Sequence, residues 1–311
     1  MATEFYLETT NGFVAILDIH YGKKCNIRLD DTEQVIHDKM LQILDYCLDN
    51  NVKVVLIAGD IFDSCSISRK SFIKAYETFS KFEKYEINLF VIYGNHDEYR
   101  YNKDFRSETP LRDLKTLGAV KIISSEDTIE ILDEQHNKYM IYGFPYLETN
   151  LLKERVFEKE NYCKNVVVAH TFYDNEFMGG ENNLTKEDIQ RINADYYILG
   201  HDHSYYPEEK IGDKRVFRFG SLVRGTSSKN DLERDVVFMH FHDGEYEEVK
   251  LDVEKLKNIT IAKATIKEEK IDYKEIIEEI KISEDDKIDI VMDAINKIEN
   301  KKIRDIIRRN V

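Results

Sequence analysis

Five short polar segments, each placed directly after a stretch of apolar residues, carry side chains that can bind metal ions. They are Asp18-Ile19-His20, Gly59-Asp60, Gly94-Asn95-His96-Asp97, Ala169-His170 and Gly200-His201-Asp202-His203. Ligands of open α/β sheets gather outside the carboxyl ends of the strands, so five separate loops can aim these groups at one place. Asp, His and Asn side chains suit manganese, iron, zinc or magnesium.

The number and types of these side chains predict a site for two divalent metal ions. Two cations about 3.5–4 Å apart need several protein ligands, one of them shared. Asp60 can bridge both ions, because a carboxylate has two oxygens. The other ligands are expected in two sets of three: Asp18, His20 and His203 for one ion, and Asn95, His170 and His201 for the other.

Such a pair of cations predicts the hydrolysis of a phosphate ester. A water shared by two metals loses a proton far more readily than bulk water, and the resulting hydroxide can attack phosphorus in line. His96 is kept off the metals as the general acid, because a histidine can protonate a leaving oxygen near neutral pH. We expect Asp97 to orient His96, as carboxylates often do for imidazoles.

The combination of the five segments, and no single segment alone, makes this pattern a specific sign of a metal site. A lone Asp-x-His or Gly-Asp is usually an ordinary surface turn, whereas five ordered segments after five apolar strands rarely arise by chance. Gly59, Gly94 and Gly200 precede ligands at points where the chain must turn sharply off a strand end, often with a positive φ.

Hydrophobic periodicity around these segments predicts an α/β fold. In the first hundred residues we expect a strand at 12–17, a helix at 32–50, a strand at 52–58, a helix at 68–82 and a strand at 87–93. The first three form a βαβ unit. Further strands are expected at 119–123, 128–132, 139–142, 165–169 and 196–199, with a helix at 185–191 and a β-rich stretch from 215 to 251.

Composition narrows the class of protein. The 311 residues carry a net charge of −15, which argues against a free-standing, sequence-independent nucleic-acid binder. It does not exclude an enzyme that touches DNA, because bound cations reverse the local sign of the charge. The sequence contains no run of about 18 apolar residues, so no membrane span is expected, and no secretory signal is evident. Scattered cysteines indicate reduced thiols, so a cytoplasmic protein is expected.

A shift in composition predicts two domains. Residues from Glu254 onward are rich in Lys, Glu, Asp and Ile and end in a basic stretch at 301–309. We therefore expect a phosphoesterase domain at 1–253 and a small α+β appendage at 254–311. The basic end could contact DNA or a partner, or simply provide favourable cations at a helix C-terminus.

Together, the five segments resemble those of the calcineurin-like metallophosphoesterase superfamily, over roughly 12–253. The resemblance implies a four-layer α/β/β/α sandwich, the seven metal ligands named above, and His96 as the acid. Asp18-Ile19-His20-Tyr21-Gly22-Lys23, Gly59-Asp60-Ile61-Phe62-Asp63, Gly94-Asn95-His96-Asp97 and Phe219-Gly220-Ser221-Leu222 are similar to the SbcD-type nuclease subunit of the SbcCD double-strand-break repair complex. That branch implies DNA cleavage with manganese, a homodimer, an SbcC-like ATPase partner of the SMC type, and a reduced DNA-capping domain at 254–311.

Three functions fit these observations. The first is a DNA exonuclease or endonuclease subunit acting in repair or recombination, favoured by the Gly-Asp-Ile-Phe-Asp segment and the C-terminal appendage. The second is a phosphatase or phosphodiesterase acting on small molecules, nucleotides or phosphoproteins, favoured by the acidic balance. The third is a metal-binding scaffold without catalysis, which the intact ligand set and His96 disfavour.

Other charged and histidine side chains are weaker candidates. Arg224 and Lys229, with Arg234, could contact a phosphate backbone or form an ordinary charged loop. His240 and His242 share a strand face and could bind another metal, but a solvated face is the simpler expectation. We expect His37 and His136 to be ordinary surface residues.

Overall fold

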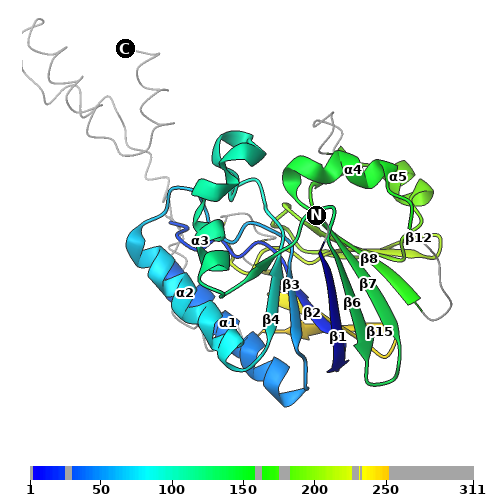
Figure 1. Ribbon diagram of the computed structural model, residues 1–311, viewed down its shortest axis with the longest axis horizontal. Coiled ribbons are helices and arrows are strands. Elements are labelled where there is room, and N and C mark those ends of the chain that lie inside the picture. The colour runs from blue at the N-terminus through cyan, green and yellow to red at the C-terminus, as the bar shows by residue number, and fades with distance from the viewer. Residues whose placement is uncertain are drawn as a thin grey trace, which may run out of the picture. The chain divides into compact units, whose positions relative to one another are not determined.

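The computed structural model describes residues 3–24, 30–157, 163–174, 183–225, 231 and 233–251. Within this part of the chain, two large β-sheets lie between two groups of helices (Figure 1). The predicted appendage at 254–311 and Lys229 lie outside the described residues, and the division of the chain at 253 stays a prediction.

The first large sheet has six strands in the order β15-β14-β2-β3-β4-β5. Their bounds are β2 Phe13–Ile16, β3 Val54–Ile57, β4 Asn88–Val91, β5 Lys121–Ile122, β14 Val237–His242 and β15 Glu245–Lys250. Strands β2 to β5 run parallel, and β14 pairs antiparallel with β2. The predicted βαβ unit at the start of the chain is confirmed, because β2 and β3 are parallel neighbours.

The second large sheet has seven strands in the order β1-β6-β7-β8-β11-β13-β12. Their bounds are β1 Glu4–Thr10, β6 Thr128–Asp133, β7 Lys138–Phe144, β8 Cys163–His170, β11 Tyr196–Gly200, β12 Tyr206–Ile211 and β13 Lys214–Arg218. Strands β7, β8, β11 and β13 are parallel to one another. A separate two-stranded sheet pairs β9 Phe172–Tyr173 with β10 Asn183–Leu184.

Four of the five α-helices in the described residues begin after a residue whose side chain caps the helix. The bounds are α1 Thr32–Asp49, α2 Arg69–Lys84, α3 Pro110–Thr116, α4 Thr149–Glu154 and α5 Lys186–Arg191, with 3₁₀ turns η1 Tyr99–Tyr101, η2 Lys103–Glu108 and η3 Tyr146–Glu148. The side chains of Asp31 and Ser68 accept backbone N–H groups at the starts of α1 and α2. Thr185 and Asp188 form a reciprocal capping box on α5.

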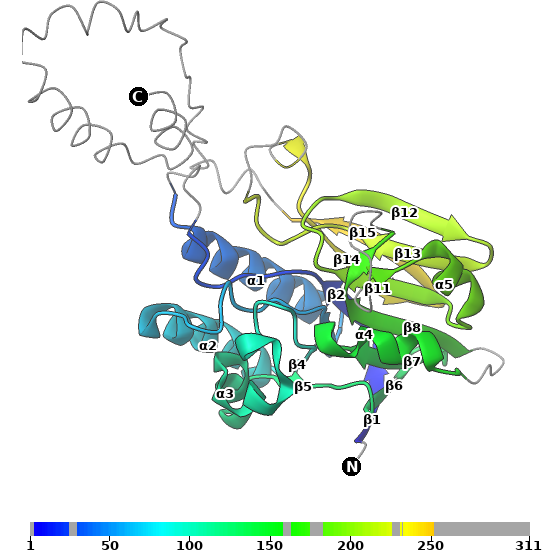
Figure 2. The ribbon, with the colours of Figure 1, turned by 90° about the horizontal axis from the view of Figure 1, so that it is seen from above.

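Apolar side chains fill three layers and so produce the four-layer α/β/β/α sandwich. Phe13, Leu56 and Ile198 belong to the core between the two sheets. Ile36 and Phe79 belong to the core between the six-stranded sheet and its helices, and Leu152 and Ile189 to the core on the outer face of the other sheet. Figure 2 shows α1 to α3 on one side of the sheets and α4 and α5 over the other. The predicted fold class is confirmed.

Sequence patterns missed the strands at the two edges of the seven-stranded sheet. These are β1 and β12, which carry many exposed side chains and lack the continuous apolar run of a buried strand. The patterns also missed the short helices α3 and α4. Among the described residues, no helix combines the length and apolar character needed to cross a membrane.

Candidate active site

The five polar segments lie at the carboxyl ends of parallel strands from both sheets. Asp18 and His20 follow β2, Asp60 follows β3, and Asn95 follows β4, all in the six-stranded sheet. His170 ends β8 and His201 directly follows β11, in the seven-stranded sheet. The site therefore forms where the carboxyl ends of two facing sheets meet, as the topology of α/β folds favours.

The first group of side chains joins the β2 loop to the segment after β11. The Nε2 atoms of His20 and His203 are 2.8 Å apart. The Oδ2 atom of Asp60 lies 3.6 Å from Nε2 of His20. Asp18 completes a group of four ligand atoms that all lie within 4.8 Å of one another, and this group could hold a metal ion.

The second group surrounds the amide oxygen of Asn95. This oxygen lies 2.9 Å from Nε2 of His170 and 2.9 Å from Nδ1 of His201. The two imidazole nitrogens are 3.3 Å from each other. Asp60 Oδ2 lies 3.4 Å from Nε2 of His170, so the same carboxylate oxygen approaches both groups.

These atoms fit a pair of divalent cations. Ligand atoms bound at 2.0–2.2 Å to one ion lie about 2.8–3.6 Å from each other, depending on whether the ion is octahedral or tetrahedral, and the separations within each group fall in this range. Asp60 is 1% exposed, and its Oδ2 accepts no hydrogen bond from the described residues. A buried carboxylate oxygen without a donor is costly, and a cation on each side of it would remove that cost.

Hydrogen bonds to the backbone orient these ligands. Nδ1 of His170 donates to the carbonyl of Ala58 at 2.7 Å, which leaves the Nε2 lone pair for a metal. The backbone N–H of His201 donates to both carboxylate oxygens of Asp18, at 3.1 and 3.2 Å. The backbone N–H of His96 donates to Asp60 Oδ1 at 2.9 Å, so the other oxygen of Asp60 remains available.

Four of these residues hold a strained backbone. Asp18, His20, Asp60 and His201 have φ values of 39°, 58°, 50° and 100°. A positive φ in a residue other than glycine costs roughly 1–3 kcal/mol and is concentrated at functional sites. The glycines before the ligands differ from expectation, since only Gly59 has a positive φ, of 89°. Gly94 and Gly200 are required for space, because a Cβ there would lie 2.0 Å from Asp60 Oδ1 or 2.3 Å from the Ala58 carbonyl oxygen.

A family model for calcineurin-like phosphoesterases matches residues 13–205, which is more than half of the chain. The chain belongs to this family. The DNA double-strand break repair protein Mre11 of Sulfurisphaera tokodaii is 25% identical over 281 residues, covering 82% of this chain and 66% of that protein. The protein of the same name from Methanocaldococcus jannaschii is 31% identical over 198 residues, covering 61% of this chain and 51% of that protein.

A solved structure shares the fold. A dimetal phosphatase from Danio rerio aligns with a TM-score of 0.50 over 78% of this chain and 96% of that chain, at 11% sequence identity. The phosphoesterase described here spans between half and two thirds of the length of the two Mre11 relatives. The family establishes a metallophosphoesterase, which is a hydrolase of phosphate esters.

Burial sets the protonation of the phosphoesterase's histidines. It lowers the pKa of His201 to about 3 and of His203 to about 4, because the charged imidazolium loses its hydration. It also holds the pKa of His20 well below its usual range. His170 differs: burial lowers its pKa, but the carboxylates of Asp60 and Asp18 outweigh burial and raise the value to about 9.

The pKa values of the two carboxyl groups of the site, Asp18 and Asp60, are shifted in opposite directions. Burial raises the pKa of Asp18 to about 7, with help from the Asp60 carboxylate. Burial also disfavours the charged form of Asp60, but His170, His20 and His96 outweigh it and hold the pKa of Asp60 below its usual range. Asp60 is therefore the carboxylate that stays ionised between the two groups of ligands.

His96 lies at the edge of the metal-binding groups. Its Nδ1 donates to the backbone carbonyl of Asp63 at 2.6 Å, and its ring packs edge-on to His20 with centroids 5.0 Å apart. The Asp63 carboxylate lies 3.5 Å from His20 Nδ1. His20, Asp63 and His96 also place ligand atoms within 4.8 Å of one another. Sequence reasoning missed Asp63, although it stands three residues after Asp60 in the Gly-Asp-Ile-Phe-Asp segment.

The carboxylate of Asp97 bonds backbone groups of two loops, and its role toward His96 stays a prediction. Its buried carboxylate accepts the backbone N–H groups of Ile61, Phe62 and Gly94, at 3.1–3.2 Å. It therefore ties the loop after β3 to the loop after β4, while Asp63 holds the His96 ring. Burial and the Asp60 carboxylate raise the pKa of Asp97 to about 8.

Two of the three basic residues proposed for phosphate contact, Arg224 and Arg234, lie in the part of the chain that the structure describes and bond within their own loop. Arg224 donates to the backbone carbonyl of Arg234. Arg234 is 7% exposed and bonds Asp231 at 2.7 Å together with the carbonyls of Ser221 and Val223, so it holds this loop together. Arg234 is thus a structural residue and not a surface phosphate contact.

Two of the four other histidines are buried, contrary to expectation. His37 contacts the Thr78 hydroxyl through Nδ1 at 2.7 Å. His240 is 1% exposed and lies against Tyr46 of α1. Each depends on a partner from a distant part of the sequence, which a local pattern does not show. His136 lies exposed in the turn between β6 and β7, as expected.

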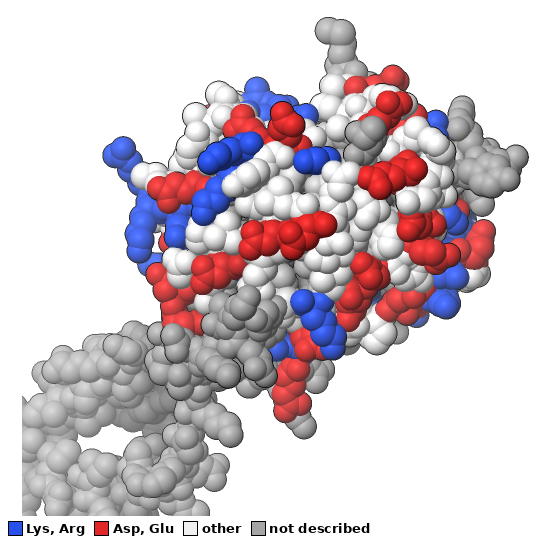
Figure 3. Space-filling model, turned by 90° about the horizontal axis from the view of Figure 1, so that it is seen from below, with Lys and Arg blue, Asp and Glu red and all other residues white. Residues whose placement is uncertain are grey.

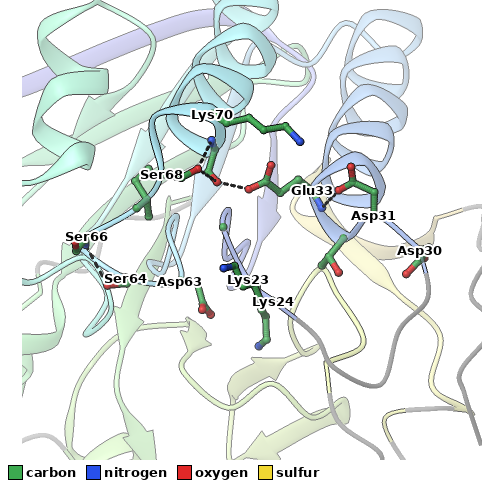
Figure 4. Close-up of a pocket in the computed structure, with 14 residues that line it drawn as sticks. Lys23, Lys24, Asp30, Asp31, Glu33, Asp63, Ser64, Ser66, Ser68 and Lys70 are labelled. Atoms are coloured by element: carbon green, nitrogen blue, oxygen red, sulfur yellow. Dashed lines mark hydrogen bonds between the residues drawn. The ribbon is translucent and has the colours of Figure 1, made fainter. Parts of the chain in front are cut away.

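A polar cavity of about 720 Å³ opens beside this site (Figure 4). Asp63 lines it, so the cavity adjoins the loop that holds His96. Three lysines also line it: Lys23 and Lys24 from the segment after β2, and Lys70 from α2. Serines of the segment leading into α2 and the acidic residues Asp30, Asp31 and Glu33 complete most of its wall.

Proposed function

We propose that this phosphoesterase is a metal-dependent DNA nuclease of the SbcD type, acting in double-strand-break repair or recombination. The position of Asp60 Oδ2 between the two groups of ligands, 3.6 Å from His20 and 3.4 Å from His170, carries the two-metal part of the proposal. The DNA substrate is supported by the sequence segments shared with SbcD-type nucleases and by relatives named as DNA double-strand break repair proteins.

Seven side chains would hold the two cations. Asp18, His20 and His203 form one set, Asn95, His170 and His201 form the other, and Asp60 serves both. When bound, two divalent cations would lower the pKa of a water and neutralise charge on the phosphoryl oxygens. Manganese is proposed by resemblance, and the same mixed oxygen and nitrogen donors also suit iron, zinc or magnesium.

His96 would protonate the leaving oxygen. Because a backbone carbonyl can only accept, the bond from His96 to Asp63 fixes the proton on Nδ1. The proton that His96 can give to a substrate is therefore the one on Nε2. Asp63 positions the ring, and the backbone N–H bond from His96 to Asp60 fixes the loop against the ligands.

The cavity beside His96 would take the strand that carries the leaving group. Lys23, Lys24 and Lys70 supply cations for phosphate oxygens there. The face drawn in Figure 3 is less favourable for DNA, because acidic side chains form a band across it and Lys and Arg lie in separate groups around this band. Phosphate contacts would thus concentrate at the metal centre and this cavity, with Arg224 and Lys229 as further candidates.

The partners follow from the same resemblance. A homodimer and an SbcC-like ATPase of the SMC type remain proposals, as does the use of 254–311 as a DNA-capping segment. The cytoplasmic location also stays a prediction. Among the described residues, Cys47, Cys65 and Cys163 are not in disulfides.

The decisive experiment compares DNA with a chromogenic phosphodiester. Labelled linear and hairpin DNA would be incubated with wild type and with His96→Ala, with manganese present or chelated, alone and with any co-encoded ATPase. We expect manganese-dependent cleavage that His96→Ala abolishes while metal content is retained. DNA that stays intact in every wild-type reaction would show that the nuclease proposal is wrong.

A phosphatase is the second candidate, supported by the net charge of −15 and by the fold shared with a dimetal phosphatase. It predicts rapid hydrolysis of a small phosphomonoester and no cleavage of DNA. A third reaction, with a chromogenic phosphomonoester in place of the phosphodiester, therefore separates the candidates without any further variant.

A further inference from the structure

A second cluster of metal-ligating side chains lies away from the active site, on the hairpin of β14 and β15. His240 and His242 share one face of β14, and Glu247 stands opposite His240 in the antiparallel register. His240 also pairs with Val14, near the start of β2. The active-site loops follow the carboxyl ends of the parallel strands, so this cluster lies at the other end of the sheet.

In each imidazole, the nitrogen that would not bind the metal contacts a hydrogen-bond acceptor. Nε2 of His240 donates to the carbonyl of Asn11 at 2.8 Å, and Nδ1 of His242 contacts Oδ2 of Asp243 at 3.1 Å. These bonds leave Nδ1 of His240 and Nε2 of His242 with lone pairs on the side of Glu247. Metal-binding histidines usually donate their other N–H to a carbonyl or carboxylate in this way.

The separations match the shell of one small cation. Oε1 of Glu247 lies 3.5 Å from Nδ1 of His240 and 3.7 Å from Nε2 of His242. The three ligand atoms all lie within 4.8 Å of one another. Nitrogen and oxygen ligands held tetrahedrally at 2.0–2.2 Å from zinc are about 3.3–3.6 Å apart. The two imidazole rings already lie close together, with centroids 4.4 Å apart and planes tilted by 33°.

The three side chains also differ in their exposure to solvent, which would allow an ion to reach the site. His240 is buried at 2% side-chain exposure, while His242 is 25% and Glu247 54% exposed. The buried imidazole gives the site a fixed anchor, and the exposed partners let an ion enter from solvent. The hydroxyl of Tyr46 lies 2.9 Å from His240 Nδ1 and 2.8 Å from Glu247 Oε1, where it bridges two of the ligands.

We propose that His240, His242 and Glu247 form an additional divalent-metal site that takes zinc, separate from the active site. Two imidazoles and one carboxylate, with a water in the fourth position, are a donor set that zinc favours. Binding would displace the Tyr46 hydroxyl from its position between His240 and Glu247. The ion would then link β14 to β15 and fasten this edge of the sheet beside α1.

Zinc content tests the proposal, because the active site contributes equally to every sample. Full-length wild type, His242→Ala and the control His136→Ala would be dialysed against the same buffered zinc solution and measured for bound zinc. We expect wild type and His136→Ala to bind one more zinc per chain than His242→Ala. Equal zinc content in wild type and His242→Ala would overturn the proposal.

A second variant protects the test against misfolding. Glu247→Gln alters a half-exposed side chain, and we expect it to lose the same single equivalent of zinc. Neither residue belongs to the proposed catalytic machinery, so phosphoesterase activity should match that of wild type in both. If Glu247→Gln keeps all the zinc of wild type, the ligand set is wrong, whatever substrate the enzyme proves to cleave.

Discussion

The Nε2 atoms of His20 and His203 face each other at 2.8 Å, although the two residues are 183 positions apart in the sequence. Burial keeps both imidazoles neutral at pH 7, since it holds the pKa of His20 well below its usual range and lowers that of His203 to about 4. Without a cation, one ring must donate its N–H to the other. With a cation, both rings offer lone pairs, and the short distance between the two Nε2 atoms is then that between two ligands of one ion.

We therefore expect metal binding to stabilise the folded chain. At manganese concentrations about a hundred times the dissociation constant, linkage gives about 2.7 kcal/mol. For a chain of this size, that corresponds to a rise in Tm of roughly 5 °C. Differential scanning fluorimetry with manganese and then with excess chelator measures the shift. Asp60→Asn should lose most of it, and an unchanged shift in that variant would contradict the bridging position of Asp60.

His96→Ala should reveal the leaving-group role of this side chain. General acids contribute about 10²–10⁴-fold in rate, and the contribution falls when the leaving oxygen needs no proton. We expect a loss of this size with a DNA or alkyl phosphodiester, and a much smaller loss with a nitrophenyl ester. Equal losses on both esters would show that His96 acts in some other way, for example as a metal ligand.

Metal affinity should rise with pH. In the metal-free protein, His170 has a pKa of about 9, because the carboxylates of Asp60 and Asp18 outweigh its burial. Below that pH a cation must displace its proton, so the apparent affinity should fall about tenfold for each pH unit lost. Below pH 7 the fall should steepen, since the pKa of Asp18 is raised to about 7 by burial.

Manganese titrations by calorimetry between pH 6 and 9 would measure this slope. His201 and His203, with pKa values of about 3 and 4, stay neutral throughout this range and add nothing to it. An affinity that is flat between pH 7 and 9 would mean that His170 is already neutral in the metal-free protein. The proton count in buffers of different ionisation enthalpy provides an independent check.

The sequence predicted the fold and the convergence of ligands because both follow local signals. Each ligand comes directly after an apolar strand, and parallel strands must place their carboxyl ends at one edge. The contacts of Asp97 could not be predicted, because they are made with backbone N–H groups of Ile61 and Phe62, in a different loop. His240 was misjudged because Tyr46, which covers it, is 194 positions away in the chain.

Backbone strain at the ligands also has no local signature. Asp18, His20, Asp60 and His201 adopt positive φ values, which are uncommon for any residue other than glycine. Such a conformation persists only when the surrounding structure imposes it, here through bonds such as that from the Ile19 N–H to the Asp60 carbonyl at 3.0 Å. The edge strands β1 and β12 were not predicted for a related reason. They are strands because they pair with their neighbours in the sheet, and their own residue pattern does not show this.

Gly94→Ala should disable the metal centre while leaving most of the fold intact. A Cβ at this position would lie 2.0 Å from Oδ1 and 2.3 Å from the backbone nitrogen of Asp60, so Asp60 must move. We expect loss of manganese-dependent activity and of the manganese-induced rise in Tm.

Gly212→Ala is the matched control, because a Cβ there meets nothing within 4 Å and only the positive φ of 65° opposes it. The control should cost about 1–2 kcal/mol of stability and keep full activity. If Gly94→Ala binds manganese as tightly as Gly212→Ala, the ligands do not depend on the close approach of the loops after β3 and β4.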